Sequence, residues 1–237
     1  MSKNIKKFPD WEDVLSSACR LQSVLPGAVV VGGTAAAVHA GHRTSYDADH
    51  ILADLRHHFD EVLAKLESTA GWRTARIAKP VIILGNLDGI LTGVRQLIRT
   101  GPLETVEIDC NGMKLTVPSE AEILRIKSVL ILKRNATRDY LDFAALYAHL
   151  GVDKAAEALV SFDGLYPQES GQSALQQLQA QLSDPMPFDL VTTDLSTYKG
   201  LSSRWRDWDN VAETLKGAAV GIFDFVCEAQ NRRPPSP

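Results

Sequence analysis

The sequence predicts an α+β protein, with a mixed β-sheet and flanking helices in residues 1–118 and a helical region in residues 119–237. Two observations support this fold class. In the first half, short apolar runs typical of strands alternate with helically spaced apolar residues. The turn at Asn111-Gly112, the strongest short hairpin signal in the chain, is followed by the last strand pattern. We therefore expect two domains with a boundary near Pro118.

The first half is expected to begin with alternating helices and strands. Thr34 would cap a short helix after the apolar run that ends at Gly32-Gly33. The period of two in a strand places Asp47 and Asp49 on the same face. The expected elements are, in order, helix 11–24, strand 28–31, helix 35–40, strand 46–53 and helix 55–66.

A β-meander and then a series of helices are expected to follow. Ser119-Glu120-Ala121-Glu122 has the pattern of a capping box, and Thr137 would cap the next helix. Residues 232–237 are expected to be disordered. The expected strands are 81–84, 90–98, 103–110 and 113–117, and the expected helices are 119–133, 137–149, 153–160, 172–182 and 209–228.

Composition excludes several classes of protein. The net charge of −4 argues against a surface coated with positive charge for nucleic acid, although a local basic patch stays open. The three cysteines are widely separated and odd in number, so we expect no disulfide framework. Neither CxxC nor a Cys/His cluster occurs, so we expect no zinc site. The polar N-terminus lacks the apolar core of a signal peptide, and no apolar run is long enough to span a bilayer. We expect a cytoplasmic protein with no membrane partner.

The residues between Val31 and Asp49 suggest a phosphate and metal site. Gly32-Gly33 lets the backbone approach an anion closely at a helix N-terminus, where free N–H groups favour negative charge. Asp47 and Asp49 could hold magnesium (or manganese) together with a triphosphate. Alone, Gly-Gly is usually a tight turn and Asp-x-Asp a solvated strand face. Their order within one strand–turn–helix–strand unit favours the functional interpretation.

These motifs resemble the AbiEii/AbiGii-type nucleotidyltransferase toxins of the polymerase-β-like nucleotidyltransferase superfamily. The resemblance covers residues 29–53 and 119–150, and the rest of the chain matches loosely. The first block has Gly32-Gly33-Thr34-Ala35, His39, His42-Arg43, Ser45, Asp47 and Asp49, and the second has Lys127, Arg134, Arg138-Asp139 and Asp142.

The resemblance implies a nucleotidyltransferase-like fold in which residues 119–237 complete the active site. It implies that Asp47 and Asp49 are catalytic metal ligands, with a third carboxylate on a strand before the helical half. Glu107 and Asp109 share a strand face, so periodicity does not choose between them, and we prefer Asp109, as a metal ligand or as the base. The nucleotide-binding residues would be Gly32, Gly33, Thr34, Arg43, Lys127, Arg134 and Arg138.

The resemblance also implies partners: a nucleoside triphosphate, an RNA acceptor such as tRNA, and a cognate antitoxin. One alternative is a transferase acting on a small molecule such as an aminoglycoside, and another is a degenerate domain that binds a nucleotide or a protein without catalysis. Lys127 could instead be a lysine snorkelling from an apolar helix face. Asp142 is interpreted as a member of a helix-surface pair and left out of the site, whereas Asp139 is expected to orient a basic residue.

Overall fold

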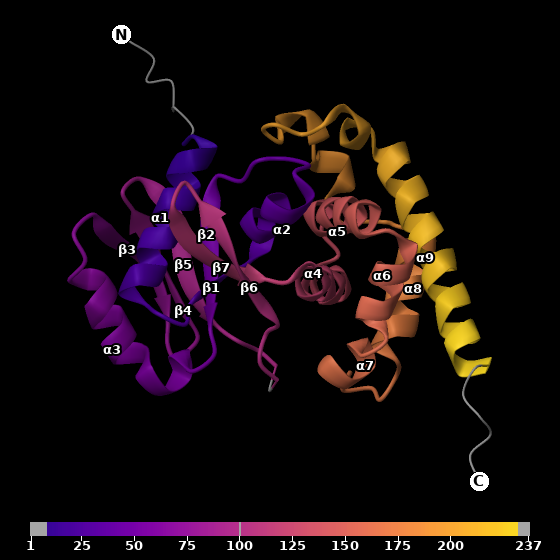
Figure 1. Cartoon of the computed structure of the whole chain (residues 1–237), viewed down its shortest axis with the longest axis horizontal. Coiled ribbons are helices and arrows are strands. Elements are labelled where there is room, and N and C mark those ends of the chain that lie inside the picture. Colours follow the sequence, from indigo (N-terminus) through magenta and orange to yellow (C-terminus); the bar gives the residue numbers. More distant parts are fainter. Residues whose placement is uncertain (1–8, 100, 232–237) are drawn as a thin grey trace. The chain divides into compact units, whose positions relative to one another are not determined.

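The computed structural model describes residues 9–99 and 101–231. The chain divides into two compact units (Figure 1). The first unit comprises the described residues up to Ala35 together with Thr44–Pro118. The second unit comprises Ala36–Arg43 and the described residues from Ser119 onward, so the helical half includes a segment from the N-terminal half of the sequence.

A five-stranded mixed sheet forms the frame of the first unit, and the predicted α+β class is confirmed. Its order is β1-β2-β5-β4-β3, in which β2 and β5 are parallel and the other neighbours are antiparallel. The strands are β1 (Val29–Val30), β2 (Asp47–Leu52), β3 (Trp72–Ala78), β4 (Ile82–Leu87) and β5 (Ile90–Gln96). The sequence pattern did not predict β3, because Trp72 is its one buried residue and the strand therefore lacks a regular apolar alternation.

The expected single meander is wrong at its end. Strands β6 (Thr105–Cys110) and β7 (Met113–Pro118) form the predicted hairpin, but they make a separate two-stranded sheet. The local pattern of a strand does not specify its partner, because pairing depends on distant residues.

Two helices cover one face of the five-stranded sheet. They are α1 (Trp11–Val24) and α3 (Leu55–Glu67), which were both predicted from apolar spacing. Leu21 of α1 and Phe59 of α3 share a core with Ile83 and Val94 of the sheet. In β2 this core side takes Ala48, His50 and Leu52, which leaves the alternate positions on the opposite face, here named the open face.

Helix α2 (Gly32–Ala40) begins three residues before the predicted start. Gly32 has φ +71, a left-handed conformation that favours glycine, and it turns the chain from β1 into the helix. The Thr34 hydroxyl does not cap the helix but donates a hydrogen bond to the Asp47 carbonyl. The expected capping role of Thr34 is therefore wrong, and the residue links the helix to β2.

The second unit is helical. Ser119 Oγ accepts the N–H of Glu122 at 3.2 Å, as the predicted capping box requires. The cap of the next helix is Ala136 rather than Thr137, whose N–H donates to Asp189 Oδ1 at 2.7 Å. The α-helices are α4 (Glu120–Arg134), α5 (Thr137–Leu150), α6 (Val152–Leu159), α7 (Phe162–Leu165), α8 (Ala174–Ser183) and α9 (Trp208–Asn231), and the 3-10 turns are η1 (Leu190–Thr192), η2 (Leu195–Thr197) and η3 (Ser203–Arg206).

Helix α4 is the centre of this unit, since it packs against α5, α6 and α8. Leu124 of α4 and Phe143 of α5 are fully buried. In the part of the chain that the structure describes, no helix is both long and apolar enough to cross a membrane. The tail predicted to be disordered, residues 232–237, lies outside the described residues.

Candidate active site

The glycine turn is tied to the strand that carries the two aspartates. Val31 N–H donates to the Asp49 carbonyl at 2.8 Å, and Thr34 Oγ donates to the Asp47 carbonyl. Both bonds lie within the first unit. They hold the start of α2, with the free N–H groups of a helix N-terminus, against β2.

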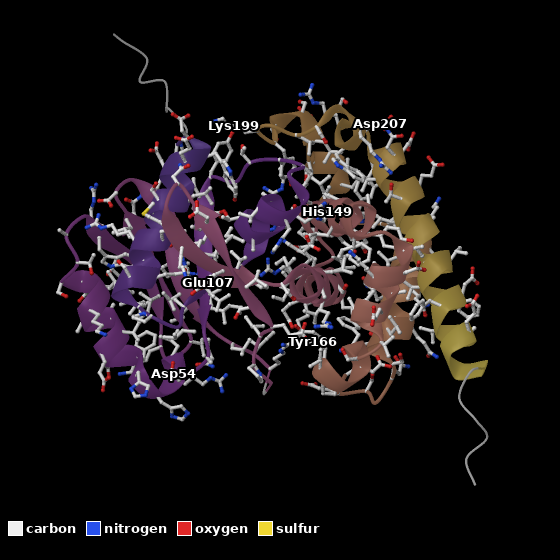
Figure 2. All side chains as sticks on the ribbon, in the orientation of Figure 1. Asp54, Glu107, His149, Tyr166, Lys199 and Asp207 are labelled. Carbon is white, nitrogen blue, oxygen red and sulfur yellow. The ribbon has the colours of Figure 1, made fainter. Side chains whose placement is uncertain are left out.

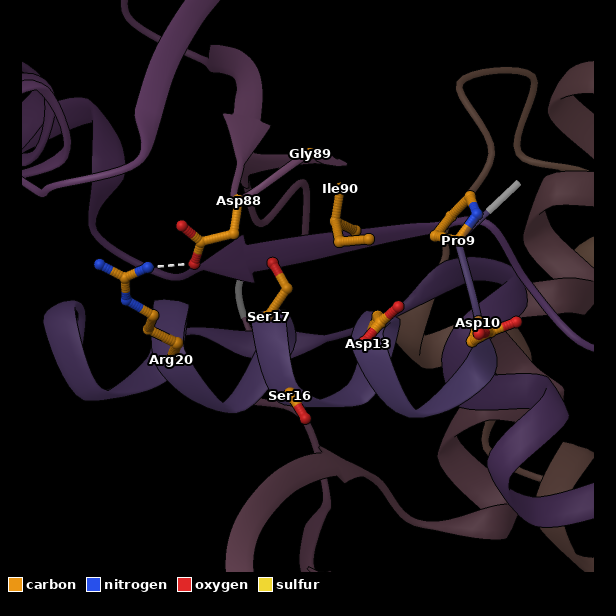
Figure 3. A pocket seen from close by; sticks show the side chains of 9 residues that line it. All are labelled: Pro9, Asp10, Asp13, Ser16, Ser17, Arg20, Asp88, Gly89 and Ile90. Carbon is orange, nitrogen blue, oxygen red and sulfur yellow. Dashed lines mark hydrogen bonds and ion pairs between the residues drawn. The ribbon is translucent and has the colours of Figure 1, made fainter. Parts of the chain in front are cut away.

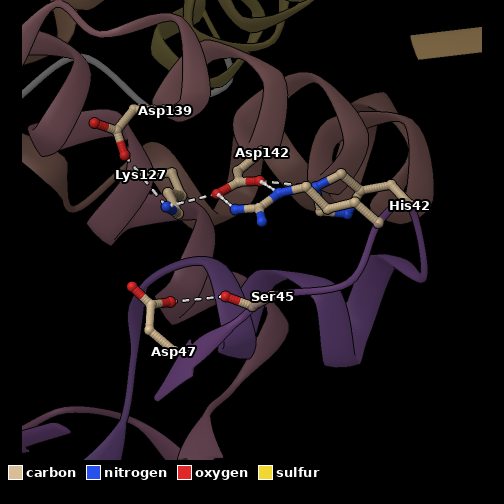
Figure 4. A network of polar contacts seen from close by, with 7 residues as sticks. His42, Ser45, Asp47, Lys127, Asp139 and Asp142 are labelled. Atoms are coloured by element: carbon tan, nitrogen blue, oxygen red, sulfur yellow. Dashed lines mark hydrogen bonds and ion pairs between the residues drawn. The ribbon is translucent and has the colours of Figure 1, made fainter. Parts of the chain in front are cut away.

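Asp47 and Asp49 lie on the open face, as the period of two predicted. The Ser45 hydroxyl donates to Asp47 Oδ1 at 2.8 Å, which fixes that carboxylate (Figure 4). Asp49 Oδ2 lies 3.8 Å from Arg95 Nη2, an ion-pair distance that is longer than a hydrogen bond. Both side chains keep solvent access, since Asp47 is exposed and Asp49 is half-buried.

These two carboxylates fit magnesium only in part. Magnesium prefers a few carboxylate oxygens together with water and phosphate oxygens, which this pair and a triphosphate would supply. Among residues 9–99 and 101–231, no three or more His, Cys, Asp or Glu side chains gather in a way that could hold a metal ion. The expected set of Asp47, Asp49 and Asp109 is therefore not assembled.

Asp109 and Glu107 both take part in the β6–β7 hairpin. The Asp109 carboxylate accepts the N–H of Gly112 at 3.2 Å, across the turn. Glu107, labelled in Figure 2, pairs with Lys114 on the neighbouring strand at 2.7 Å. The prediction of Asp109 as a third metal ligand or base gains no support from this arrangement, because its strand belongs to the separate two-stranded sheet.

In the second unit, Asp142 is the centre of a buried charge network (Figure 4). It lies 2.7 Å from Lys127 Nζ, 2.8 Å from Arg43 Nε and 2.8 Å from His42 Nε2. Burial alone would raise the pKa of Asp142, but Arg43, Lys127 and His42 outweigh burial and hold this pKa well below its ordinary range. The interpretation of Asp142 as a helix-surface pair is wrong, since the carboxylate is fully buried.

Lys127 is held by two carboxylates. Besides Asp142, its ammonium contacts Asp139 Oδ1 at 3.2 Å, which is the orienting contact expected for Asp139. The snorkelling alternative is wrong, because only 3 % of the Lys127 side chain is exposed. A charge this deeply buried has to be paired, and Asp139 and Asp142 provide that pairing.

Arg43 is fixed on a second side. Its guanidinium lies 5.5 Å from the ring centroid of Tyr198, in a cation–π arrangement. The backbone N–H of Ser202 donates to the His42 carbonyl at 2.9 Å. Arg134 at the end of α4 and Arg138 in the first turn of α5 are both exposed, unlike Lys127.

A pocket of about 480 Å³ lies elsewhere in the first unit, beside α1 and the turn between β4 and β5 (Figure 3). Arg20 and Asp88 form an ion pair at one end of it. None of the residues that line it is a predicted site residue. The pocket therefore gives no support to the predicted nucleotide site.

Sequence reasoning missed four contributors to these clusters. Ser45 and His42 are part of the motifs, but their contacts were not assigned, and Asp142 was assigned to a helix-surface pair. The spacing His42-Arg43-x-Ser45-x-Asp47 was a signal for the first two. Arg95 had no local signal, because its position beside Asp49 depends on the pairing of β2 with β5.

The fold is that of the nucleotidyltransferases. A structure from H. pylori assigned to the nucleotidyltransferases covers 94% of this chain and 97% of its own, with a TM-score of 0.55 and 16% identity. The structure of JHP933 from Helicobacter pylori covers 93% of this chain and 94% of its own, with a TM-score of 0.53 and 14% identity. At such identities these likenesses show the fold alone.

Sequence comparison gives a different set of relatives. No family model matches the chain. It is 33% identical over 129 residues to the mycolic acid-containing lipids exporter MmpL11 of Mycolicibacterium smegmatis, covering 53% of this chain and 13% of that protein. The heme uptake protein MmpL11 of Mycobacterium tuberculosis strain H37Rv is 36% identical over 112 residues. The match spans 13% of the length of the first of these curated relatives and 11% of the second.

Proposed function

We propose that this chain is a metal-dependent nucleotidyltransferase that moves a nucleoside monophosphate from a nucleoside triphosphate to an acceptor hydroxyl. The observation that carries this proposal is the attachment of Asp47 and Asp49 to the glycine turn that begins α2. This attachment supports the proposal, because N–H groups at a helix N-terminus favour an anion and two carboxylates beside them could hold a metal ion.

In the proposed reaction, the acceptor hydroxyl oxygen attacks the α-phosphorus and gives its proton to solvent water. The bond from the α-phosphorus to the oxygen that bridges the α- and β-phosphates breaks, which releases pyrophosphate. Bound magnesium or manganese would neutralise charge on the triphosphate. Asp47 and Asp49 would hold that ion, with Ser45 orienting the Asp47 carboxylate. The N–H groups at Gly32, Gly33 and Thr34 would bind phosphate oxygens, so catalysis depends on positioning and charge more than on covalent help.

In the second unit, Lys127 and Arg43 are the basic residues that we propose for contact with an anionic substrate. Asp142 orients both. The exposed Arg134 and Arg138 are proposed for the same purpose. Because both are exposed, neither needs a buried counter-charge, as Lys127 does.

The finer proposal is a toxin of the AbiEii/AbiGii type that modifies RNA such as tRNA and is neutralised by a cognate antitoxin. The two ordered motif blocks support it. Expression of the wild-type chain without an antitoxin is then expected to slow bacterial growth, and expression of Asp49→Ala is expected to leave growth normal. Full growth at high expression of the wild type would contradict the toxin proposal but leave the transferase proposal standing.

The experiment that tests the transferase proposal uses each of the four nucleoside triphosphates labelled at the α-phosphate. The purified chain is incubated with one of them, magnesium or manganese, and either total RNA or a panel of aminoglycosides. Label in RNA that requires Asp47 and Asp49 supports the RNA proposal. Label in an aminoglycoside alone supports the small-molecule alternative. No metal-dependent transfer to any acceptor, with folded protein, would overturn the proposed activity.

A further inference from the structure

Strand pairing places a third charged residue on the open face, beside the two aspartates. In the parallel register of β2 and β5, Asp47 is opposite Leu91, Asp49 is opposite Gly93 and Ile51 is opposite Arg95. Residues in register point to the same side of a sheet. Arg95 therefore shares the open face with Asp47 and Asp49.

The other two positions of β5 on that face do not carry charge. Leu91 is an apolar side chain and is 62% exposed. At Gly93, a Cβ would lie 2.5 Å from Leu84 Cδ2 and 2.8 Å from the Ile83 carbonyl oxygen, so this position has no room for a side chain. The strand next to the aspartates thus supplies an arginine and no carboxylate.

We infer that Arg95 is a phosphate-binding residue of the active site, acting as a fixed cation beside the single metal ion that Asp47 and Asp49 can hold. This inference rests on the proposed function. Arginine stays charged, and its planar guanidinium matches two phosphate oxygens. Two carboxylates and one divalent ion leave most of the negative charge of a triphosphate uncompensated, and the guanidinium offsets part of it.

The contacts of Arg95 suit this role. Its Nη2 lies 3.8 Å from Asp49 Oδ2, too far for a hydrogen bond. The two side chains are 37% and 34% exposed. The guanidinium can therefore turn from Asp49 to a phosphate without breaking a buried hydrogen bond. Before nucleotide binds, the same positive charge opposes a cation at Asp49.

The inference predicts that removing the charge of Arg95 affects triphosphate binding and Mn²⁺ binding differently. Arg95→Met keeps the aliphatic stem and removes the charge. We expect it to weaken binding of a nucleoside triphosphate about tenfold or more in EDTA, where no metal contributes. We expect Mn²⁺ binding without nucleotide to stay equal or to become a few-fold tighter, because a repelling charge has been removed.

The two affinities are measured by triphosphate titration calorimetry in EDTA and by Mn²⁺ electron paramagnetic resonance without nucleotide. The matched control is Arg76→Met on β3, an exposed arginine of the same sheet that is in register with Leu84 of β4. It should leave both affinities unchanged. Arg95→Lys keeps the charge but not the planar fork, and it is expected to fall between the wild type and Arg95→Met.

Weakened triphosphate binding by Arg95→Met with undiminished Mn²⁺ binding supports the inference. Unchanged triphosphate affinity, or weaker Mn²⁺ binding, overturns it, while label transfer by the wild type would leave the proposed function intact. If Arg95→Met lowers the thermal midpoint, the triphosphate affinity of Arg95→Lys decides instead. An affinity weaker than that of the wild type, down to that of Arg95→Met, supports phosphate binding by the planar guanidinium. An affinity equal to that of the wild type overturns the inference. A wild type that binds no triphosphate overturns both the inference and the proposed function.

Discussion

Replacing Asp142 by asparagine is expected to destabilise the second unit strongly. The wild-type carboxylate is fully buried and faces the cations of Lys127 at 2.7 Å and Arg43 at 2.8 Å. Asparagine keeps the size of the side chain but removes the carboxylate charge that faces both cations, so that Lys127 keeps Asp139 as a buried counter-charge while Arg43 loses the carboxylate it contacts. Breaking a buried ion pair by removing one partner costs about 3–5 kcal/mol, so we expect a loss of about 4 kcal/mol in the free energy of unfolding.

Urea unfolding followed by circular dichroism measures this loss, since the second unit is helical. With a slope of about 2 kcal/mol per molar urea, the midpoint should fall by about 2 M. Asp139→Asn is the matched control, because Asp139 contacts Lys127 alone in this network, at 3.2 Å. Its loss should be smaller, about 1–2 kcal/mol.

Combining Asp142→Asn with Lys127→Met should cost less than the sum of the two single changes, because both changes remove the same contact between Asp142 and Lys127. A loss below about 1 kcal/mol for Asp142→Asn, or a loss no larger than that of Asp139→Asn, would refute the assignment of Asp142 as the centre of the network.

Three further results are expected. Asp47→Ala and Asp49→Ala should each reduce label transfer about a thousandfold or more, which corresponds to about 4 kcal/mol of transition-state stabilisation, while the thermal midpoint stays near wild type; transfer near the wild-type rate would remove the metal assignment. Asp109→Asn and Glu107→Gln should each change the transfer rate less than about threefold, because both carboxylates form contacts within the β6–β7 hairpin. A large loss for Asp109→Asn alone would identify Asp109 as the third carboxylate of the site. Burial lowers the pKa of His50 to about 4, so the stability that the neutral ring contributes is complete above pH 6.5 and is lost as pH falls toward 4, by about 3 kcal/mol in total. Urea midpoints should fall over this pH range in the wild type but not in His50→Gln. Parallel curves of midpoint against pH for the two proteins would contradict this prediction.

Local patterns were sufficient for part of this molecule. The alternation of β2 gave the shared face of Asp47 and Asp49, and apolar spacing gave α1 and α4. Such features depend on neighbours within a few residues, so a single sequence contains the information for them.

Features that depend on distant pairing were beyond local patterns. Asp142 has the spacing of a surface helix pair with Arg138, yet its partner His42 is 100 residues away in the sequence. Asp109 has the alternation of a sheet strand, but alternation does not say which sheet the strand joins. Arg95 reaches Asp49 only through the parallel register of β2 and β5.

The membership of Ala36–Arg43 in the second unit affects the order in which the chain can fold during synthesis. His42 leaves the ribosome 100 residues before Asp142, which at about 5–20 residues per second is a delay of about 5–20 s. Over that time β2 and β5 can pair, because both are complete by Gln96. Arg43 and Lys127, however, have no Asp142 to join them until α5 has emerged. A nascent chain paused before Asp142 should therefore protect the amides of β2 while those of α4 still exchange with solvent.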